Sequence, residues 1–251
     1  LVMCARPNRL HFVVLAVLLI GCSGDPHPTG SVAGSALPSA SVQQREGSRQ
    51  KDAAAPGATP QRQILFGDLH VHTSYSFDSY LSSQRRDPWD AYRYARGEAI
   101  ILPDANGEQK VTAQIGRPLD FTAVTDHAEF FGQINICTQD ASKLGYWWPH
   151  CTMTRARNIW VQLIAANWWT DLGGQLEDPP SKSFACSLSD CDAADAQTWQ
   201  RTQQAAEENY DRSAACEFST FVAYEYTEAF DQNNMHRNVI FRNNTVTDRP
   251  V

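Results

Sequence analysis

The distribution of apolar and polar positions predicts an ordered α/β chain that begins abruptly near residue 63. Short apolar runs with the length of buried strands recur at residues 64–66 (ILF), 119–125 (LDFTAVT), 218–226 (FSTFVAYEY) and 239–241 (VIF). Segments with helical signals separate these runs. Because strands and helices alternate along the chain, we expect an α/β fold.

The first helix is predicted at residues 87–97. Asp87 suits the N-cap, Pro88 suits the first turn, and Gly97 suits the C-terminal stop. The polar stretch at residues 103–109 (PDANGEQ) follows this helix. It predicts a hairpin or a loop before the second strand.

A long insertion is expected after the second strand. Residues 128–193 show no clear pattern, so we expect an irregular segment. We expect its Trp pairs, at 147–148 and 168–169, to pack within the insertion, and an exposed binding element is the alternative. Residues 194–213 then favour a helix. Spacings of seven and four place three candidate inward positions on one face of it, namely Trp199, Ala206 and Tyr210.

The N-terminal residues have the pattern of an export signal. Arg6 and Arg9 precede an apolar run at residues 10–20 (LHFVVLAVLLI), which is shorter than the about 20 residues that span a bilayer. The run ends in LIGC, which resembles a bacterial lipobox, so we expect lipidation of Cys22. A plain signal peptide or a short anchor is the alternative. Ser23 after the Cys favours the outer membrane.

These patterns divide the chain into a signal segment at residues 1–22, a tether at residues 23–62 and a folded domain at residues 63–251. The tether is rich in Ser, Pro, Ala and Gly. It cannot bury enough apolar surface to offset its chain entropy, so we expect it to be disordered. The expected location is the bacterial envelope, facing the periplasm, with the lipid as the contact to the membrane.

Charge and cysteine content narrow the picture further. The formal net charge of -7 argues against nucleic acid as a partner. Export leads to an oxidising compartment, in which disulfides persist. Among the seven Cys residues, we expect local bridges that join Cys137 to Cys151 and Cys186 to Cys191. Cys216 is then left over.

The strongest chemical signal is the segment GDLHVHTSYSFD at residues 67–78. His70 and His72 are two apart at the end of a predicted strand, so both imidazoles project from one face. Two imidazoles on one face form half of a metal site. Asp68 shares this face, and we expect it to orient an imidazole.

Three further residues have the same chemical character. His127 follows the predicted strand at residues 119–125, within the motif T-D-H. Glu225 lies in the middle of an apolar strand, where an uncompensated carboxylate is costly, and a bound metal would resolve this cost. His236 lies just before the last apolar run.

The order of these residues resembles the metal-ligand series of the PHP (polymerase and histidinol phosphatase) superfamily of metal-dependent hydrolases. The segments GDLHVHTSYSFDSYL, RPLDFTAVTDHAEFFG, FVAYEYTEA and MHRNVIFRN are similar to one branch of it, the DUF3604 family of unknown function. The resemblance covers residues 64–251 and implies a distorted barrel of the TIM type. The positions that match the ligand series are His70, His72, Asp78, His127, Glu225 and His236.

The resemblance also implies the chemistry. We expect two or three divalent ions of Zn, Mn or Fe, bridged by Glu225 and a water that becomes hydroxide near neutral pH. Glu225 and Asp126 are the expected catalytic residues. The expected substrate is a small molecule, in the first instance a phosphoester.

Later ligands of the superfamily, another His and an Asp-x-His pair, have no counterpart after His236. We therefore expect a longer protein, of which this chain forms an incomplete barrel with an unpaired edge near residues 239–241. We also expect the chain alone to be inactive.

Three other functions remain open. Amide or deaminase chemistry of the amidohydrolase kind uses a similar H-x-H strand, but its frequent carboxylated Lys has no obvious candidate, since Lys110, Lys143 and Lys182 lie in loop-like sequence. An exported binding protein with a structural metal site is the second. A nuclease is the third, and export and net acidity argue against it.

Overall fold

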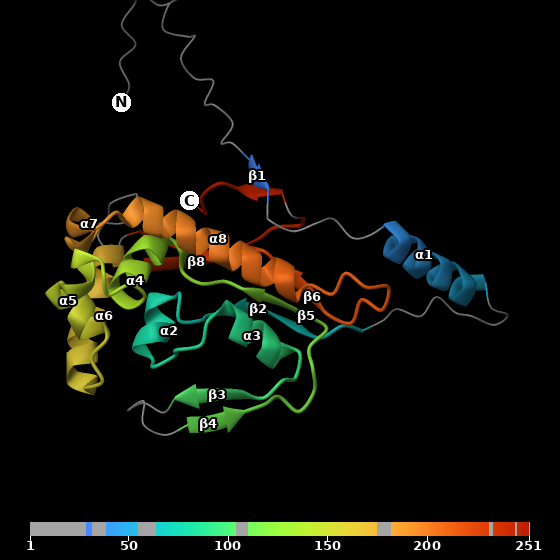
Figure 1. Cartoon of the computed structure of the whole chain (residues 1–251), viewed down its shortest axis with the longest axis horizontal. Coiled ribbons are helices and arrows are strands. Elements are labelled where there is room, and N and C mark those ends of the chain that lie inside the picture. Colours follow the sequence, from blue (N-terminus) through green and yellow to red (C-terminus); the bar gives the residue numbers. More distant parts are fainter. Residues whose placement is uncertain are drawn as a thin grey trace, which may run out of the picture.

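The computed structural model describes residues 29–31, 39–54, 64–103, 110–174, 182–230, 233–243 and 245–250. These residues form a mixed α/β structure around a small parallel sheet (Figure 1). The expected signal segment, with Cys22, lies outside the described residues. Among the helices that the structure describes, none is long and apolar enough to cross a membrane.

The central sheet contains three parallel strands in the order β2 (Gly67–Val71), β5 (Phe121–Val124) and β6 (Ser219–Phe221). In the register, Phe121 lies opposite Gly67 on one side and Ser219 on the other. A Cβ atom at Gly67 would lie 2.4 Å from the carbonyl oxygen of Phe121, so only glycine permits this approach of the two strands. The sheet brings the carboxyl ends of segments far apart in sequence to one edge.

The third strand continues past Val222 into β7 (Ala223–Phe230), which pairs antiparallel with β8 (Asn233–Ile240). An isolated parallel bridge joins His127 to Glu225, so β7 extends along the segment that follows β5. The strands of the described residues form no barrel. The expectation of a barrel-like sheet is not met, because β8 returns through a hairpin instead of a helical crossover and cannot add a parallel strand.

Several local predictions are confirmed. Helix α3 (Pro88–Ala95) begins after Asp87, whose side chain accepts a hydrogen bond from the backbone of Asp90. Gly97 ends the helix with a φ of 88°, a conformation that favours glycine. The polar stretch after α3 separates the strands of a hairpin, β3 (Ile100–Pro103) and β4 (Lys110–Ala113).

Part of the segment that was expected to be a disordered tether has regular structure. A strand β1 (Thr29–Ser31) pairs with β9 (Thr245–Thr247), and α1 (Ser39–Ala54) is a helix. Helix formers such as Gln, Arg, Lys and Ala are frequent in α1, which explains the helix without an apolar face. Arg45 in this helix donates to the carbonyl oxygens of Asp211 and Ser213.

The main core lies between the sheet and two helices. Helices α3 and α8 (Cys191–Asn209) contact one another and β5. Trp199 and Ala206 of α8 are buried, as predicted, whereas Tyr210 is only half-buried just beyond the last turn. Figure 1 shows α8 running along the sheet, where it connects the insertion to the strands.

The described parts of the insertion, residues 128–174 and 182–193, are mostly helical, so the prediction of an irregular segment is wrong there. Its helices gather at one end of the molecule in Figure 1. They are η1 (Ala128–Phe130), α4 (Phe131–Thr138), η2 (Leu144–Trp147), α5 (Pro149–Thr154), α6 (Ile159–Gly174) and α7 (Ala185–Leu188). A short helix α2 (Phe77–Leu81), which follows the first strand, contacts α6.

Helical periodicity did not reveal α6, because this helix carries apolar residues on all its sides. Trp169 is fully buried, whereas Trp160 remains 72% exposed. Trp169 packs with the cluster that contains Cys137 and Cys151, which confirms for this Trp the expected role inside the insertion.

The prediction that residues 64–66 form a strand and that this strand is buried is wrong on both points. Ile64, Leu65 and Phe66 are exposed and precede β2. The β2–β5 register begins at Gly67, and the carbonyl oxygen of Phe66 accepts from the backbone N–H of Asp120 at 2.7 Å. The apolar side chains stay exposed because β2 lies at the edge of the described sheet and has a neighbour on one side.

Two disulfides confirm the predicted pairing. Cys137 bonds to Cys151 and Cys186 bonds to Cys191, while Cys216 is free. Both bridges lie in the insertion, and they support an oxidising compartment for the protein.

We expect removal of the first bridge by the double substitution Cys137→Ser and Cys151→Ser to lower the free energy of unfolding by about 2–4 kcal/mol, because the bridge constrains the unfolded chain. Urea unfolding of the oxidised protein measures this loss. A Cys216→Ser variant serves as the control and should unfold as the parent does. An unchanged midpoint in the double variant would contradict a stabilising role.

Candidate metal centre

The candidate site lies at the carboxyl ends of the parallel strands. His70 and His72 come from the end of β2, His127 follows β5, and Glu225 lies on β7 next to His127. The backbone N–H of Glu225 donates to the carbonyl of Asp126 at 3.0 Å, which fixes the two segments side by side. In open α/β sheets, substrates and cofactors bind at this edge.

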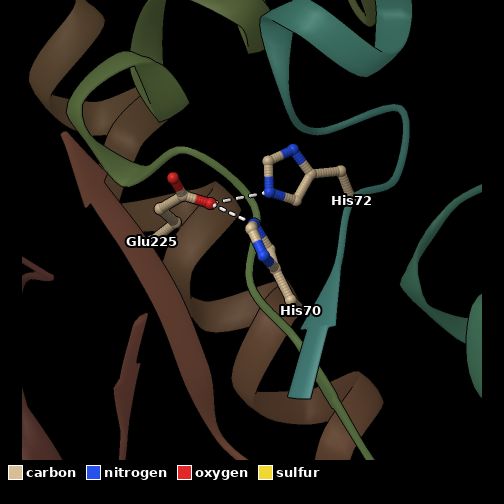
Figure 2. Close-up of side chains that lie close together, drawn as sticks. All are labelled: His70, His72 and Glu225. Carbon is tan, nitrogen blue, oxygen red and sulfur yellow. Dashed lines mark hydrogen bonds and ion pairs between the residues drawn. The ribbon is translucent and has the colours of Figure 1, made fainter. Parts of the chain in front are cut away.

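One oxygen of Glu225 contacts both histidines of the first strand (Figure 2). The Nε2 atoms of His70 and His72 each lie 2.8 Å from Oε2 of Glu225. The two rings point the same way because the residues are two apart on a strand, and their centroids are 5.0 Å apart. The predicted convergence of the H-x-H pair with Glu225 is confirmed.

The other oxygen of Glu225 contacts the last histidine of the series. Nδ1 of His236 lies 2.5 Å from Oε1 of Glu225. His236 is directly opposite Thr227 in the β7–β8 pair, and Thr227 is two residues after Glu225, so all three side chains share a face. The register of the hairpin therefore brings His236 to the site.

Asp78 and His127 complete the candidate site. Both oxygens of Asp78 lie near Nδ1 of His72, at 3.0 and 3.2 Å, and Oδ2 is 3.8 Å from Nε2 of His127. Ser76 holds this geometry, because its hydroxyl donates to Asp78 at 2.5 Å and accepts from the backbone of His127 at 3.2 Å.

Ligand atoms of these six residues form three overlapping groups, within each of which all atoms lie within 4.8 Å of one another. Imidazole nitrogens and carboxylate oxygens at such distances can hold a divalent ion. The groups are His70, His72 and Glu225; His72, Asp78 and His127; and His127, Glu225 and His236.

The electrostatics of the site favour positive charge. Burial alone would lower the pKa of His72, but Asp78 and other nearby carboxylates outweigh it and raise the pKa to about 9. Burial would raise the pKa of Glu225, yet the neighbouring His127 and His72 hold it below its usual range. The pKa of Asp78 is also lowered, because hydrogen bonds from His72 and Ser76 outweigh its burial. Ionised carboxylates surrounded by imidazoles are a suitable environment for a cation.

The site is closed on one side and open on the other. The side chains of Glu225 and His127 are 1% and 5% exposed. Those of His70, His236 and Asp78 are 57%, 50% and 44% exposed. Solvent therefore reaches one side of the ligand cluster.

Two predicted site residues have other partners. Asp126 is completely buried, and its carboxylate accepts from the backbone and the hydroxyl of Thr73 at 2.5 and 2.6 Å. It lies outside the three groups and ties the loop after β2 to the loop after β5. Asp68 accepts from the backbone N–H of His70 at 3.0 Å, and this is a contact to the main chain rather than to an imidazole.

The sequence did not single out three residues that support the ligands. Ser76 bridges Asp78 and His127, as described above. Oγ1 of Thr227 lies 2.9 Å from Nδ1 of His236 and 3.2 Å from Nδ1 of His127. Glu129 lies 2.8 Å from Nδ1 of His127. Thr227 could have been found from the sequence, because it lies two residues after Glu225 on one strand and therefore shares its face.

Comparisons with known proteins agree with the resemblance to the DUF3604 family noted in the sequence. A family model described as "Protein of unknown function (DUF3604)" matches residues 59–251. No curated protein and no solved structure matches the chain. The match covers more than half of the chain and includes every residue of the metal centre, so the chain belongs to the DUF3604 family.

Proposed function

We propose that the protein is a metal-dependent hydrolase that uses a metal-activated water, and that its substrate is a small phosphoester. The main support is the exposure of the candidate ligands. Glu225 is buried, whereas His70, His236 and Asp78 are open to solvent. Structural metal sites are closed by their ligands, whereas catalytic sites keep a position for water and substrate.

The two oxygens of Glu225 support a site for more than one ion. Oε2 faces the pair His70 and His72, and Oε1 faces His236. Each neutral imidazole offers one lone pair, whereas a carboxylate can bridge two ions. Glu225 would thus join two neighbouring ions, and Asp78 with His127 would contribute to a third or complete the second.

Bound ions would supply a water with a lowered pKa and would neutralise charge on a phosphoryl oxygen. The residues of the chain perform the remaining tasks. Asp78 holds Nδ1 of His72 and so directs its Nε2 towards the centre of the site. Thr73 and Asp126 hold the loops that present the ligands. The exposed side of the cluster leaves space for substrate.

Phosphoester hydrolysis is preferred over amide hydrolysis for three reasons. The ligand order resembles the PHP superfamily, and a carboxylate with oxygens facing two groups suits an in-line displacement between two ions. The lysines also disfavour the amidohydrolase alternative, since Lys143 contacts Asn135 and Lys182 contacts Asp192, both outside the three ligand groups.

The identity of the ions, their surroundings and the cellular location belong to the same proposal. The His and carboxylate ligands suit Zn, Mn or Fe. We place the protein in the bacterial envelope with a lipid on Cys22, and the two disulfides support an oxidising compartment.

The test is hydrolysis by the full-length, metal-loaded protein. We expect turnover of p-nitrophenyl phosphate or bis-p-nitrophenyl phosphate, loss of turnover with a chelator, and recovery with Mn or Zn. A control with an amide such as a p-nitroanilide separates the alternatives. Turnover of the anilide alone would favour amide chemistry, and tight metal binding without any turnover would favour a binding protein with a structural metal site.

A further inference from the structure

We propose that Glu129 is a positioning residue that selects which nitrogen of His127 binds a metal ion. This inference rests on the proposed metal centre and assigns a residue that lies outside its three ligand groups. Glu129 lies in η1, directly after His127. Among the described residues of that short helix, only Glu129 makes a polar contact with the imidazole.

The contact fixes the tautomer of His127. Oε1 of Glu129 lies 2.8 Å from Nδ1 of His127. A carboxylate only accepts hydrogen bonds, so Nδ1 carries the hydrogen and donates it. The lone pair of a neutral ring then resides on Nε2, and Nε2 lies 3.8 Å from Oδ2 of Asp78. That spacing suits two ligands of one ion.

An ion held through Nδ1 of His127 would need the opposite tautomer. Nδ1 faces the hydroxyl of Thr227 at 3.2 Å, and the same hydroxyl is 2.9 Å from Nδ1 of His236. Binding of an ion between His127 and His236 through these Nδ1 atoms would require His127 to give up its contact with Glu129. Glu129 therefore leaves Nε2, the nitrogen near Asp78, as the metal-binding nitrogen of His127.

The burial of Glu129 distinguishes this role from ordinary packing. Its side chain is 2% exposed, and its second oxygen, Oε2, is buried without a hydrogen-bond partner among the residues that the structure describes. A buried carboxylate with a single contact to a neutral ring is costly. A cation on Nε2 would polarise the Nδ1–H group and strengthen this contact, as in carboxylate–histidine–zinc arrangements. The charge at the metal thus compensates for the buried charge of Glu129.

The experiment compares Glu129→Ala and Glu129→Gln with the full-length parent protein. Metal affinity is measured by competition with a chelator, with Zn as the probe. Removal of an outer partner costs about 10–100-fold in metal affinity, and we expect this loss for Glu129→Ala. Glu129→Gln retains an accepting oxygen and should retain most of the affinity. Glu228→Gln is the matched control, since Glu228 lies on β7 and pairs with Arg237 instead of a ligand.

A second readout identifies the coordinating nitrogen. In protein loaded with ¹¹³Cd and labelled with ¹⁵N, coupling between the two nuclei should appear at Nε2 of His127 in the parent and should move to Nδ1, or disappear, in Glu129→Ala. Coupling at Nδ1 in the parent, or unchanged affinity and coupling in a folded Glu129→Ala variant, would overturn the role of Glu129. Absence of metal binding by the parent would instead refute the proposed metal centre itself.

Discussion

Glu225→Gln is expected to lose metal binding and hydrolysis together, by more than about a hundredfold. Glu225 contacts His70, His72 and His236, and its two oxygens face different ligand groups. The amide has nearly the same shape but lacks the negative charge and one accepting oxygen. Removal of a residue that only contacts a metal ligand lowers metal affinity about 10–100-fold, so removal of a ligand shared by two groups should lower it more. Chelator competition and turnover of a model phosphoester measure the two effects.

Glu228→Gln again provides the control, because it removes a carboxylate from the same strand without touching the ligand groups. A fold check by circular dichroism separates loss of ligand from loss of structure. If Glu225→Gln bound metal as tightly as the parent protein, Glu225 would not be a metal ligand, and the proposed site built around its two oxygens would fail.

Trp169→Ala is expected to lower the free energy of unfolding by about 3–5 kcal/mol, the usual cost of truncating a buried Trp. Trp169 is fully buried, and its ring stacks on Phe77 with centroids 5.4 Å apart. Its indole N–H donates to the hydroxyl of Thr154 at 3.0 Å, so the substitution also leaves a buried hydroxyl without this donor. Urea unfolding followed by circular dichroism measures the change.

Trp160→Ala on the same helix is the matched control. Trp160 is 72% exposed, and its removal should change stability by less than about 0.5 kcal/mol. Equal effects of the two substitutions would show that the insertion is not packed around Trp169. Because Phe77 also contacts the ring of His127, with centroids 5.0 Å apart, Trp169→Ala should further weaken metal binding.

The sequence was sufficient to predict most members of the candidate ligand cluster because they follow local rules. His70 and His72 are two apart on one strand, and His127 directly follows the next strand. Glu225 was recognisable because a carboxylate in an apolar strand needs compensation. The approach of His236 depends on the register of the β7–β8 hairpin, and only the resemblance to a known ligand order placed it in the site.

Features that depend on packing were not predictable in this way. Helix α6 is apolar on all sides, so no periodic pattern revealed it. The run at residues 64–66 is apolar enough for a buried strand, but it precedes β2 at the edge of the described sheet, where its side chains stay exposed. Glu129 is an acidic residue in a short helix, and nothing in its local pattern indicates that its side chain is buried against His127.

The spread of the candidate ligands along the chain would link metal supply to the lifetime of the fold. The contributing segments begin at residue 70 and end at residue 236, so the ligand groups exist only when distant strands are assembled. An ion that binds the assembled state and not the unfolded chain stabilises it, by about 2.7 kcal/mol when the free ion is at a hundred times its dissociation constant. Where metal is scarce, the protein would unfold more often and would become a substrate for proteases, so its abundance would follow the metal supply.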